Sequence, residues 1–383
     1  MKTPSYYEFF AGGGMARAGL GEQWRCLFAN DFDHKKGRAY RENWRGSELK
    51  TADIGSLTTD DLPGKANLAW ASFPCQDLSL AGGGAGLKGD RSGTFWPFWN
   101  LMRDLVKERR APRLIVLENV CGALTSHGGR DFATICGAFQ QAGYGVGAVV
   151  VDAALFVPHS RPRLFIIGVH PDVRLRKDLT AQGPSSPWHT RPLRTAYEKL
   201  APKTKREWIW WNLPLPQKRE MNLADIIEEN PHGTSWFSDD EVRQLLNMMS
   251  PINRAKVAEA KRQGGKIVGG VYKRTRPNEE GGKVQRAEIR FDDVSGCLRT
   301  PAGGSSRQVI VIVDGQSVKA RLISSRETAR LMGLPEDYAL PENYNEAYHL
   351  TGDGVVVPVV RYLAEHIFEP ALGADLQSAT AAA

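Results

Sequence analysis

A glycine-rich stretch near the N-terminus, residues 7–20 with the sequence YEFFAGGGMARAGL, constrains the fold most. It is typical of a short strand, a tight turn and the start of a helix, which together open a doubly wound α/β sheet. The three glycines permit positive φ angles and a close approach of a ligand to the backbone. Phe10 offers a ring face beside this turn. The stretch therefore predicts a Rossmann-like domain with a nucleotide-like cofactor at its first turn.

An acidic residue follows at the spacing expected for ribose recognition. Asp31 lies about twenty residues after the glycines, directly behind the apolar run 26–29, which we interpret as the second strand. The same arrangement suits a nicotinamide dinucleotide. This half of the chain alone therefore leaves both a methyltransferase and a dehydrogenase open.

The pattern of apolar runs divides the chain. Short strands alternate with helical stretches up to a strand at 164–169, as in a mostly parallel sheet, whereas Pro and Trp become frequent from residue 172. Alternating runs at 266–268 and 287–291 indicate a small β-rich module, and an interrupted helix over 347–368 is expected to return to the first sheet. We predict a catalytic and cofactor-binding domain over 1–171, a second domain over 172–305, a return to the first over 306–370 and a disordered tail over 371–383.

Composition argues against several classes of protein. No apolar run approaches the ~20 residues of a membrane span, and the first residues lack the apolar stretch of a signal peptide. The chain has an odd number of cysteines without Cys-x-x-Cys spacing, which argues against disulfides and a structural zinc site. They are Cys26, Cys75, Cys121, Cys136 and Cys297. We expect a soluble cytoplasmic protein that holds no metal.

Three residue types farther along the chain suit carbon methylation of cytosine. Cys75 stands in the run FPCQ, Glu118 ends the apolar run 114–117, and Arg161 and Arg163 follow. Attack of a thiolate on carbon 6 turns the ring into an enamine whose carbon 5 accepts a methyl group. A carboxylic acid at the Watson–Crick edge relieves the resulting charge, and a guanidinium fork holds the acid and the ring carbonyl. A hydride-transfer enzyme has no need of this set.

At these residues the chain resembles the bacterial DNA (cytosine-5)-methyltransferases. Nine segments resemble the family's motifs in the family's order, between residue 6 and about residue 365. The nine are residues 10–14, 30–33, 53–54, 73–76, 86–93, 118–120, 157–165, 325–333 and 352–355.

The resemblance implies transfer of a methyl group from S-adenosylmethionine to carbon 5 of a flipped-out cytosine in double-stranded DNA, through a covalent Cys75 adduct. It implies that the catalytic residues are Cys75, Glu118, Arg161 and Arg163, and that the domain over 172–305 is a target-recognition domain whose loops enter the major groove. Cofactor contacts are implied for Phe10, Ala11, Gly12, Gly14, Asp31, Phe32, Asp53, Ile54, Pro74, Asp353 and Val355. DNA contacts are implied for Gln76, Ser79, Arg91 and Asn119. We expect a monomer, and whether a cognate restriction endonuclease accompanies it stays open.

Three positions depart from the family's usual pattern. His159 stands where the family usually has Gln, and Asp353 stands where it usually has Asn. Ser92 separates Arg91 from Gly93, which the family often has adjacent. None of these departures replaces the thiol, the acid or Arg163.

The distribution of basic residues predicts where DNA binds. A formal net charge of +7 indicates little by itself, but Lys and Arg concentrate between residues 250 and 330, next to glycine pairs. The run 297–308 has no apolar period, and we interpret it as a loop on the phosphates that flank the flipped base, with a structural Gly-Gly hairpin as the alternative. Its contact residues would be Arg299, Thr300, Gly303 and Gly304. The runs 272–276 and 285–290 predict an exposed hairpin whose arginines either read bases or form a solvated basic surface.

Other interpretations stay open. The tryptophans at 208, 210 and 211 are expected to be structural in the second domain rather than to stack on bases. Enzymes that modify tRNA share the catalytic set but carry a different run after the catalytic Cys-Gln than Asp77-Leu78-Ser79. A non-enzymatic DNA-binding protein could also retain the fold. Base specificity lies in loop geometry, so the target sequence is not predicted.

Overall fold

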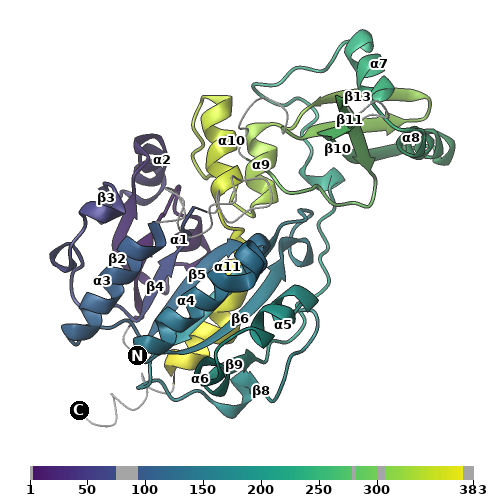
Figure 1. The fold of residues 1–383 in the computed structure, drawn as a ribbon. Coiled ribbons are helices and arrows are strands. Elements are labelled where there is room, and N and C mark those ends of the chain that lie inside the picture. The colour runs from purple at the N-terminus through teal and green to yellow at the C-terminus, as the bar shows by residue number, and fades with distance from the viewer. Residues whose placement is uncertain (1–2, 75–93, 278–281, 300–306, 374–383) are drawn as a thin grey trace. The chain divides into compact units, whose positions relative to one another are not determined.

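The computed structural model describes residues 3–74, 94–277, 282–299 and 307–373. The chain forms two compact units (Figure 1). The first comprises Met1–Asp152, Pro162–Leu215 and Val355–Ala383, and the second comprises Ala153–Arg161 and Pro216–Gly354. Both units are thus assembled from segments that are distant in the sequence.

A large mixed sheet forms the centre of the first unit, with the strand order β3-β2-β1-β4-β5-β7-β6-β9-β8 in the described part of the chain. Strands β3, β2, β1, β4 and β5 are parallel neighbours, whereas β7 runs antiparallel to both β5 and β6. The bounds are β1 Ser5–Phe9, β2 Arg25–Asp31, β3 Leu49–Thr51, β4 Leu68–Ala71, β5 Leu114–Val120, β6 Gly145–Asp152, β7 Pro162–Val169, β8 Thr180–Ala181 and β9 Trp208–Trp211. The predicted doubly wound, mostly parallel sheet is confirmed.

Helices cover both faces of this sheet, which is why its central strands are continuously apolar (Figure 1). On one face, α3 (Phe95–Lys107) and α4 (Arg130–Gln141) pack aromatic side chains against β1, β4 and β5. On the other, α1 (Met15–Leu20) packs against α11 (Val357–Leu363). A Cβ on Gly19 would lie 2.4 Å from Cβ of Val360, so glycine permits this close approach. The remaining helix between β2 and β3 is α2 (His34–Trp44).

Residues 172–215, predicted to open the second domain, pack within the first unit instead. Strand β9 pairs with β6 and β8 at the far edge of the sheet. Helices α5 (Arg191–Glu198) and α6 (Pro202–Arg206) pack against α4. Trp211 is fully buried, and the rings of Trp208 and Trp210 pack against Tyr197. These tryptophans therefore belong to the large sheet, and not to the second domain as expected.

The second unit is built on a separate antiparallel sheet with the order β11-β10-β12-β13. Its strands are β10 Lys266–Pro277, β11 Lys283–Arg290, β12 Val309–Asp314 and β13 Ser317–Leu322. Helices α7 (Asp239–Asn247) and α8 (Pro251–Gln263) contribute Val242, Leu245, Val257 and Ala260 to a core with this sheet. The unit also includes α9 (Ser325–Leu331) and α10 (Tyr344–Asp353). The predicted β-rich module is confirmed, and its unit extends beyond residue 305.

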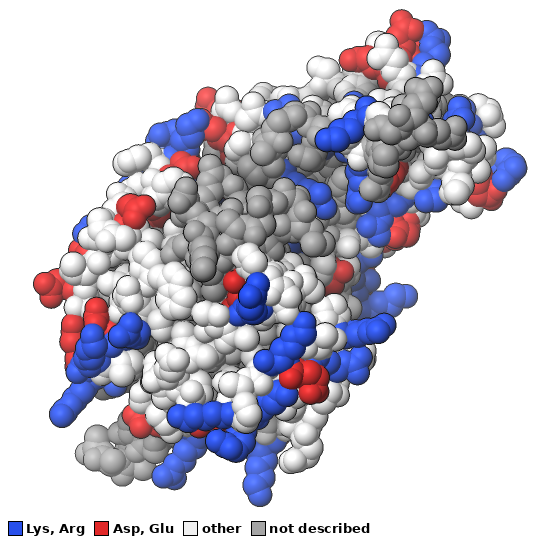
Figure 2. All heavy atoms as spheres, viewed as in Figure 1, with Lys and Arg blue, Asp and Glu red and all other residues white. Residues whose placement is uncertain are grey.

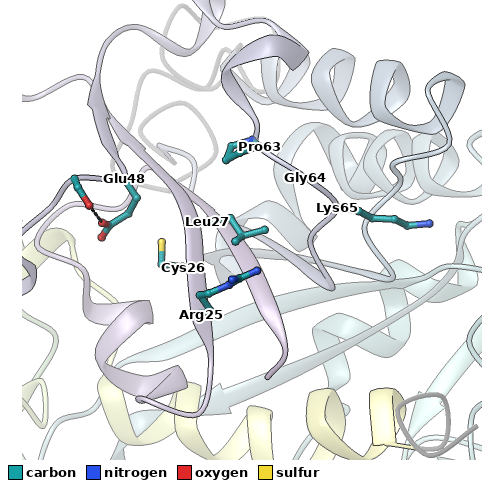
Figure 3. Close-up of a pocket in the computed structure, with 8 residues that line it drawn as sticks. Arg25, Cys26, Leu27, Glu48, Pro63, Gly64 and Lys65 are labelled. Atoms are coloured by element: carbon teal, nitrogen blue, oxygen red, sulfur yellow. Dashed lines mark hydrogen bonds between the residues drawn. The ribbon is translucent and has the colours of Figure 1, made fainter. Parts of the chain in front are cut away.

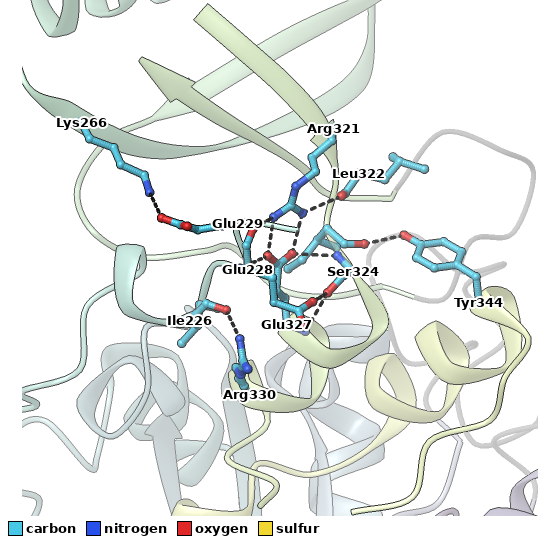
Figure 4. Close-up of polar contacts among 11 residues, drawn as sticks. Ile226, Glu228, Glu229, Lys266, Arg321, Leu322, Ser324, Glu327, Arg330 and Tyr344 are labelled. Carbon is cyan, nitrogen blue, oxygen red and sulfur yellow. Dashed lines mark hydrogen bonds and ion pairs between the residues drawn. The ribbon is translucent and has the colours of Figure 1, made fainter. Parts of the chain in front are cut away.

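A buried ion pair joins β13 to α9 (Figure 4). The side chains of Arg321 and Glu327 have no exposed surface, and Arg321 Nη1 donates to Glu327 Oε2 at 2.8 Å. Arg321 Nη2 also donates to the carbonyl of Glu228 at 2.8 Å, and its guanidinium lies 5.0 Å from the centre of the Trp236 ring. The backbone N–H of Ser324 donates to Glu327 Oε2. This network fixes the small sheet, the segment around Glu228 and α9 to one another.

The C-terminal helix continues farther than expected. Ala371 and Leu372, which the predicted tail included, are helical and fully buried, whereas residues 374–383 lie outside the described residues. None of the helices in the described ranges is both long enough and apolar enough to cross a membrane. The same ranges contain no cluster of His, Cys, Asp and Glu that could hold a metal ion.

Candidate active site

Most predicted site residues of the first unit lie at one edge of its sheet. Because β1 to β5 are parallel, their carboxyl ends meet at this edge, and β1 lies at the point where the strand order reverses. The residues at or just behind these ends are Phe10, Asp31, Asp53, Pro74 and Glu118. The antiparallel strand β7 begins at the same edge and adds Arg163. We call this the carboxyl edge.

Glu118 and Arg163 form an ion pair at the carboxyl edge. Arg163 lies opposite Val120, and Val120 shares a face of β5 with Glu118, so the strand register places the two charged side chains diagonally across from each other. Arg163 Nε lies 3.1 Å from Glu118 Oε1, and their side chains are only 14% and 9% exposed. A guanidinium at this distance fixes a carboxylate with a charge-assisted hydrogen bond. The predicted acid and its arginine are thus brought together.

Asn119 projects from the opposite face of β5, and its side chain forms hydrogen bonds with two backbone groups. Its Nδ2 donates to the carbonyl of Phe73 at 3.2 Å, and its Oδ1 accepts from the N–H of Val120 at 2.9 Å. Asn119 is buried. It therefore anchors the residue that precedes Pro74 and Cys75, although the sequence predicted a contact with DNA. The predicted residues Cys75, Gln76, Ser79 and Arg91 lie outside the described residues.

The glycine turn after β1 is held by Asp31. Asp31 Oδ2 accepts from the N–H of Gly12 at 2.8 Å, and its Oδ1 accepts from the N–H of Asp33 at 2.8 Å. Burial raises the pKa of Asp31, while these two donors oppose the increase. The predicted ribose acid thus also supports the turn.

Two glycines of this turn serve different needs. Gly12 has φ +56°, and a Cβ there would meet no atom within 4 Å, so its outer side is open to a ligand. Gly14 has φ +77°, and a Cβ there would lie 2.3 Å from Nε1 of Trp44. That indole N–H donates to the carbonyl of Gly13 at 3.0 Å. The indole explains why position 14 requires glycine, and sequence reasoning missed it because Trp44 lies thirty residues away at the end of α2.

Other predicted cofactor residues differ in exposure. Phe32 is 65% exposed directly behind β2. Phe10 and Ala11 lie in the turn, and Phe10 has a left-handed backbone with φ +57°. Asp53 caps a 3-10 helix by accepting from the N–H of Gly55 at 2.7 Å, which leaves Ile54 buried. Among these residues, Phe32 is exposed whereas Ile54 is buried.

Arg161 has a different environment from Arg163. Its side chain is buried in the second unit, where it donates to the carbonyls of Leu298 at 3.0 Å, Gly352 at 2.7 Å and Gly354 at 2.8 Å. Such contacts hold two backbone segments together. The structure therefore gives Arg161, predicted as catalytic, a positioning role among these carbonyls.

His159 is fully buried beside Arg161's partners. Its Nε2 accepts from the N–H of Leu298 at 3.1 Å, so its Nδ1 donates to the carbonyl of Leu331 at 3.1 Å. Burial lowers the pKa of His159 and keeps the ring neutral. A neutral imidazole in this tautomer offers one donor and one acceptor, as a Gln side chain does. This equivalence accounts for His in place of the family's usual Gln.

The remaining predicted residues lie at two segment ends. Asp353 is exposed at the end of α10, and Val355 is buried. Arg299 is exposed, whereas Thr300, Gly303 and Gly304 lie outside the described residues. Sequence reasoning also missed the pair of Arg321 and Glu327. Its signal was an arginine within β13, followed six residues later by a glutamate in the first turn of α9.

Comparison with known proteins agrees with this geometry. A model of the family "C-5 cytosine-specific DNA methylase" matches residues 5–369. Type II methyltransferase M.BsuFI of Bacillus subtilis is 24% identical over 97% of this chain and 74% of its own length. M.NlaX of Neisseria lactamica is 26% identical over 94% of this chain and 95% of its own.

Solved structures share the fold. The Dnmt2 methyltransferase of S. pombe superposes with a TM-score of 0.60 at 16% identity, over 96% of this chain and 99% of that one. A putative DNA modification methyltransferase from an E. coli prophage superposes with a TM-score of 0.54 at 14% identity, over 96% and 99% of the two chains. The family match spans both units and includes the paired acid and arginine at the carboxyl edge. The chain therefore belongs to the C-5 cytosine-specific DNA methylase family and is a DNA (cytosine-5)-methyltransferase.

Proposed function

We propose that this enzyme methylates carbon 5 of cytosine in double-stranded DNA, with S-adenosylmethionine as the donor and a covalent adduct of Cys75 as the intermediate. The observation that carries the proposal is the ion pair of Glu118 and Arg163 at the carboxyl edge. Asn119, between the acid and Val120, anchors the strand end that leads to Cys75. Methyl incorporation into duplex DNA and into tRNA, measured side by side, tests the substrate class. Incorporation into tRNA alone would refute it.

The residues present fit the proposed cofactor. Gly12 leaves open space on its outer side, Asp31 holds the turn, and the exposed ring of Phe32 can cover an adenine. Asp53 lies at the end of the neighbouring strand β3. When bound, S-adenosylmethionine supplies an electrophilic methyl group. The other steps belong to the chain's own side chains.

The Cys75 thiolate forms a bond to carbon 6, which moves the ring's electron pair toward carbon 5 and nitrogen 3. Glu118 donates a proton to nitrogen 3, and Arg163 orients the carboxyl group while it faces the ring carbonyl. After carbon 5 has gained the methyl group, a base from solvent takes the proton of carbon 5, the electrons of that C–H bond turn toward carbon 6, and nitrogen 3 returns its proton to Glu118. The thiolate then leaves carbon 6. Holding the base outside the helix exposes both ring atoms.

Replacement of Glu118 by glutamine is expected to slow methylation on the order of 10²-fold or more, with little change in DNA affinity. The amide keeps the size of the side chain and most of its hydrogen bonding but cannot donate the proton. Single-turnover rates and DNA titrations separate the two effects. The matched control is Glu108→Gln, which removes an exposed acid paired with Arg110 at 2.8 Å and should leave the rate unchanged. A parallel loss of rate and folding stability would make Glu118 a structural residue.

We also propose that the second unit reads the target sequence, and the hairpin of β10 and β11 distinguishes its arginines. Arg274 lies 3.3 Å from Glu288, and Arg290 donates to Asp292 at 2.6 Å. Arg286 is exposed and has no ionic partner within the described ranges. An arginine without a carboxylate partner keeps its N–H groups available for a bidentate hydrogen bond to a guanine or for a phosphate. The side chain of Arg276 lies outside the described residues.

Arg286→Ala is therefore expected to change DNA recognition more than Arg290→Ala, its matched control. If Arg286 reads a base, the free-energy difference between the correct base and the other bases at one position of the target falls by about 1–3 kcal/mol. If it binds a phosphate, affinity falls for all sequences and the salt dependence flattens by about one unit of slope. Genome-wide mapping of 5-methylcytosine and binding at several salt concentrations decide between these results. If the methylated sites and the affinity are unchanged, the residues that read the target lie elsewhere, in the loop that begins at Arg299.

A restriction endonuclease encoded nearby is the protein partner to test, because the relatives are named Type II methyltransferases.

A further inference from the structure

A basic surface lies on the first unit, apart from the β10–β11 hairpin and from the loop that begins at Arg299. Between residues 191 and 207 the chain carries six basic and two acidic residues. The basic ones are Arg191, Arg194, Lys199, Lys203, Lys205 and Arg206. Figure 2 shows that Lys and Arg outnumber acids over the part of the first unit that holds α5 and α6. We call these residues the α5–α6 surface.

Four of these cations are not neutralised by the protein. Leu193 and Ala196 are buried, so Arg191 and Arg194, three residues apart, project together from the outer face of α5. Lys203 and Arg206 repeat this spacing on α6, where Thr204 is buried. Within the described residues none of the four has a carboxylate partner. Lys205, by contrast, lies 3.6 Å from Glu198.

Such an arrangement costs stability in the isolated protein. Exposed like charges at this spacing repel one another, and solvated helix faces usually mix both signs. A surface that concentrates one sign instead attracts the opposite charge from solution. The chemistry that satisfies several guanidinium and ammonium groups in a row is a chain of phosphates.

The α5 part of this surface adjoins the carboxyl edge, whereas α6 leads into the amino end of β9, which pairs with the start of β6. Helix α5 packs against the 3-10 helix Cys121–Leu124, which follows β5 and therefore Glu118 directly. Lys199, at the end of α5, donates from Nζ to the carbonyl of Gly128 at 2.7 Å, in the next turn of the same connection. Helix α5, with Arg191 and Arg194, thus lies on the β6–β9 side of the edge that carries Glu118 and Arg163.

We propose that the α5–α6 surface binds the phosphates of duplex DNA that flanks the target site, beyond the recognised bases. This inference rests on the proposed function, because it takes duplex DNA as the substrate. Contacts of this kind are independent of sequence and release counterions. They lengthen the stretch of duplex that contributes to affinity and leave the chemistry at the carboxyl edge unchanged.

The test compares a double variant, Arg191→Gln with Arg194→Gln, with a control that loses the same charge. The control is Arg25→Gln with Lys65→Gln, since both residues are exposed beside a cleft of about 550 Å³ (Figure 3), where Arg25 begins β2 and Lys65 precedes β4. They lie at the amino ends of these strands, at the opposite edge of the sheet from Glu118. Affinity is measured for a duplex of about 14 base pairs around a mapped methylation site and for one of about 50 base pairs, at several salt concentrations.

The α5 variant should bind the long duplex about tenfold more weakly and reduce the slope of log K against log salt by about two. Its affinity for the short duplex and its rate at saturating DNA should equal those of the wild type, and the control should match the wild type throughout. An equal loss on both duplexes, or no loss, would overturn the inference while leaving the proposed function intact. A loss confined to tRNA would assign the surface to RNA and overturn it as well. Wild-type protein that neither binds nor methylates duplex DNA would instead refute the proposed function, and this inference with it.

Discussion

Replacement of Cys75 by serine is expected to abolish methyl transfer while leaving the binding of DNA and cofactor largely intact. A hydroxyl group does not supply a comparable anion near neutral pH, so the bond to carbon 6 does not form. The measurement is tritium transfer to duplex DNA under single-turnover conditions. A second readout is trapping on DNA that carries 5-fluorocytosine at the target, where the wild type should form an adduct that resists denaturant and the variant should not.

Cys121→Ser is the matched control for this prediction. Burial raises the pKa of the Cys121 thiol to about 11, so it is not a thiolate at neutral pH although it follows β5 directly. We expect this variant to retain both the rate and the trapped adduct. Transfer by Cys75→Ser at more than a few per cent of the wild-type rate would contradict the covalent mechanism.

Removal of Arg321 is expected to have the largest effect on stability. Arg321→Ala leaves Glu327 without its partner in a site that has no exposed surface, which costs about 3–5 kcal/mol. Urea unfolding followed by tryptophan fluorescence measures the loss. Arg321→Met combined with Glu327→Leu should recover most of it, because both charges are then removed.

The exposed pair of Arg330 and Glu336 serves as the control for Arg321. Arg330 Nε lies 2.8 Å from Glu336 Oε1, but Glu336 is 64% exposed, so Glu336→Ala should cost no more than about 1 kcal/mol. A loss of similar size for Arg321→Ala would mean that water reaches the buried pair. Recovery by the double variant would also separate the charge effect from a general loss of packing around Trp236.

The sequence predicted those features that depend on residues close together in the chain. The glycine turn, the strand ends and the order of the acid and arginine were read correctly, because parallel strands bring their carboxyl ends to one edge. The different surroundings of Arg161 and Arg163 were not predictable in this way. The two arginines are separated only by Pro162, yet β7 begins at that proline, and Arg161 lies outside the strand. Its partners near Leu298 and Gly352 are more than a hundred residues away.

The unit boundary near residue 172 was missed for a related reason. Strands β8 and β9 have two and four residues, too few to show alternation, and they join the large sheet only through pairing with β6. The bond from the Asn119 amide to the carbonyl of Phe73 was likewise not predictable, because a position in a motif does not tell which backbone that amide meets. In each case a long-range contact decided the outcome.

The short segment Ala153–Arg161 belongs to the second unit although β6 and β7, which flank it, belong to the first. A chimera that takes only residues 216–354 from a relative would therefore keep the recipient's version of this loop. The His159 ring accepts a hydrogen bond from the N–H of Leu298 and donates one to the carbonyl of Leu331. Arg161 donates to the carbonyls of Leu298 and Gly352. We therefore expect a graft of the second unit to keep these contacts when both segments are transplanted together, and natural exchange of such units between relatives would face the same constraint.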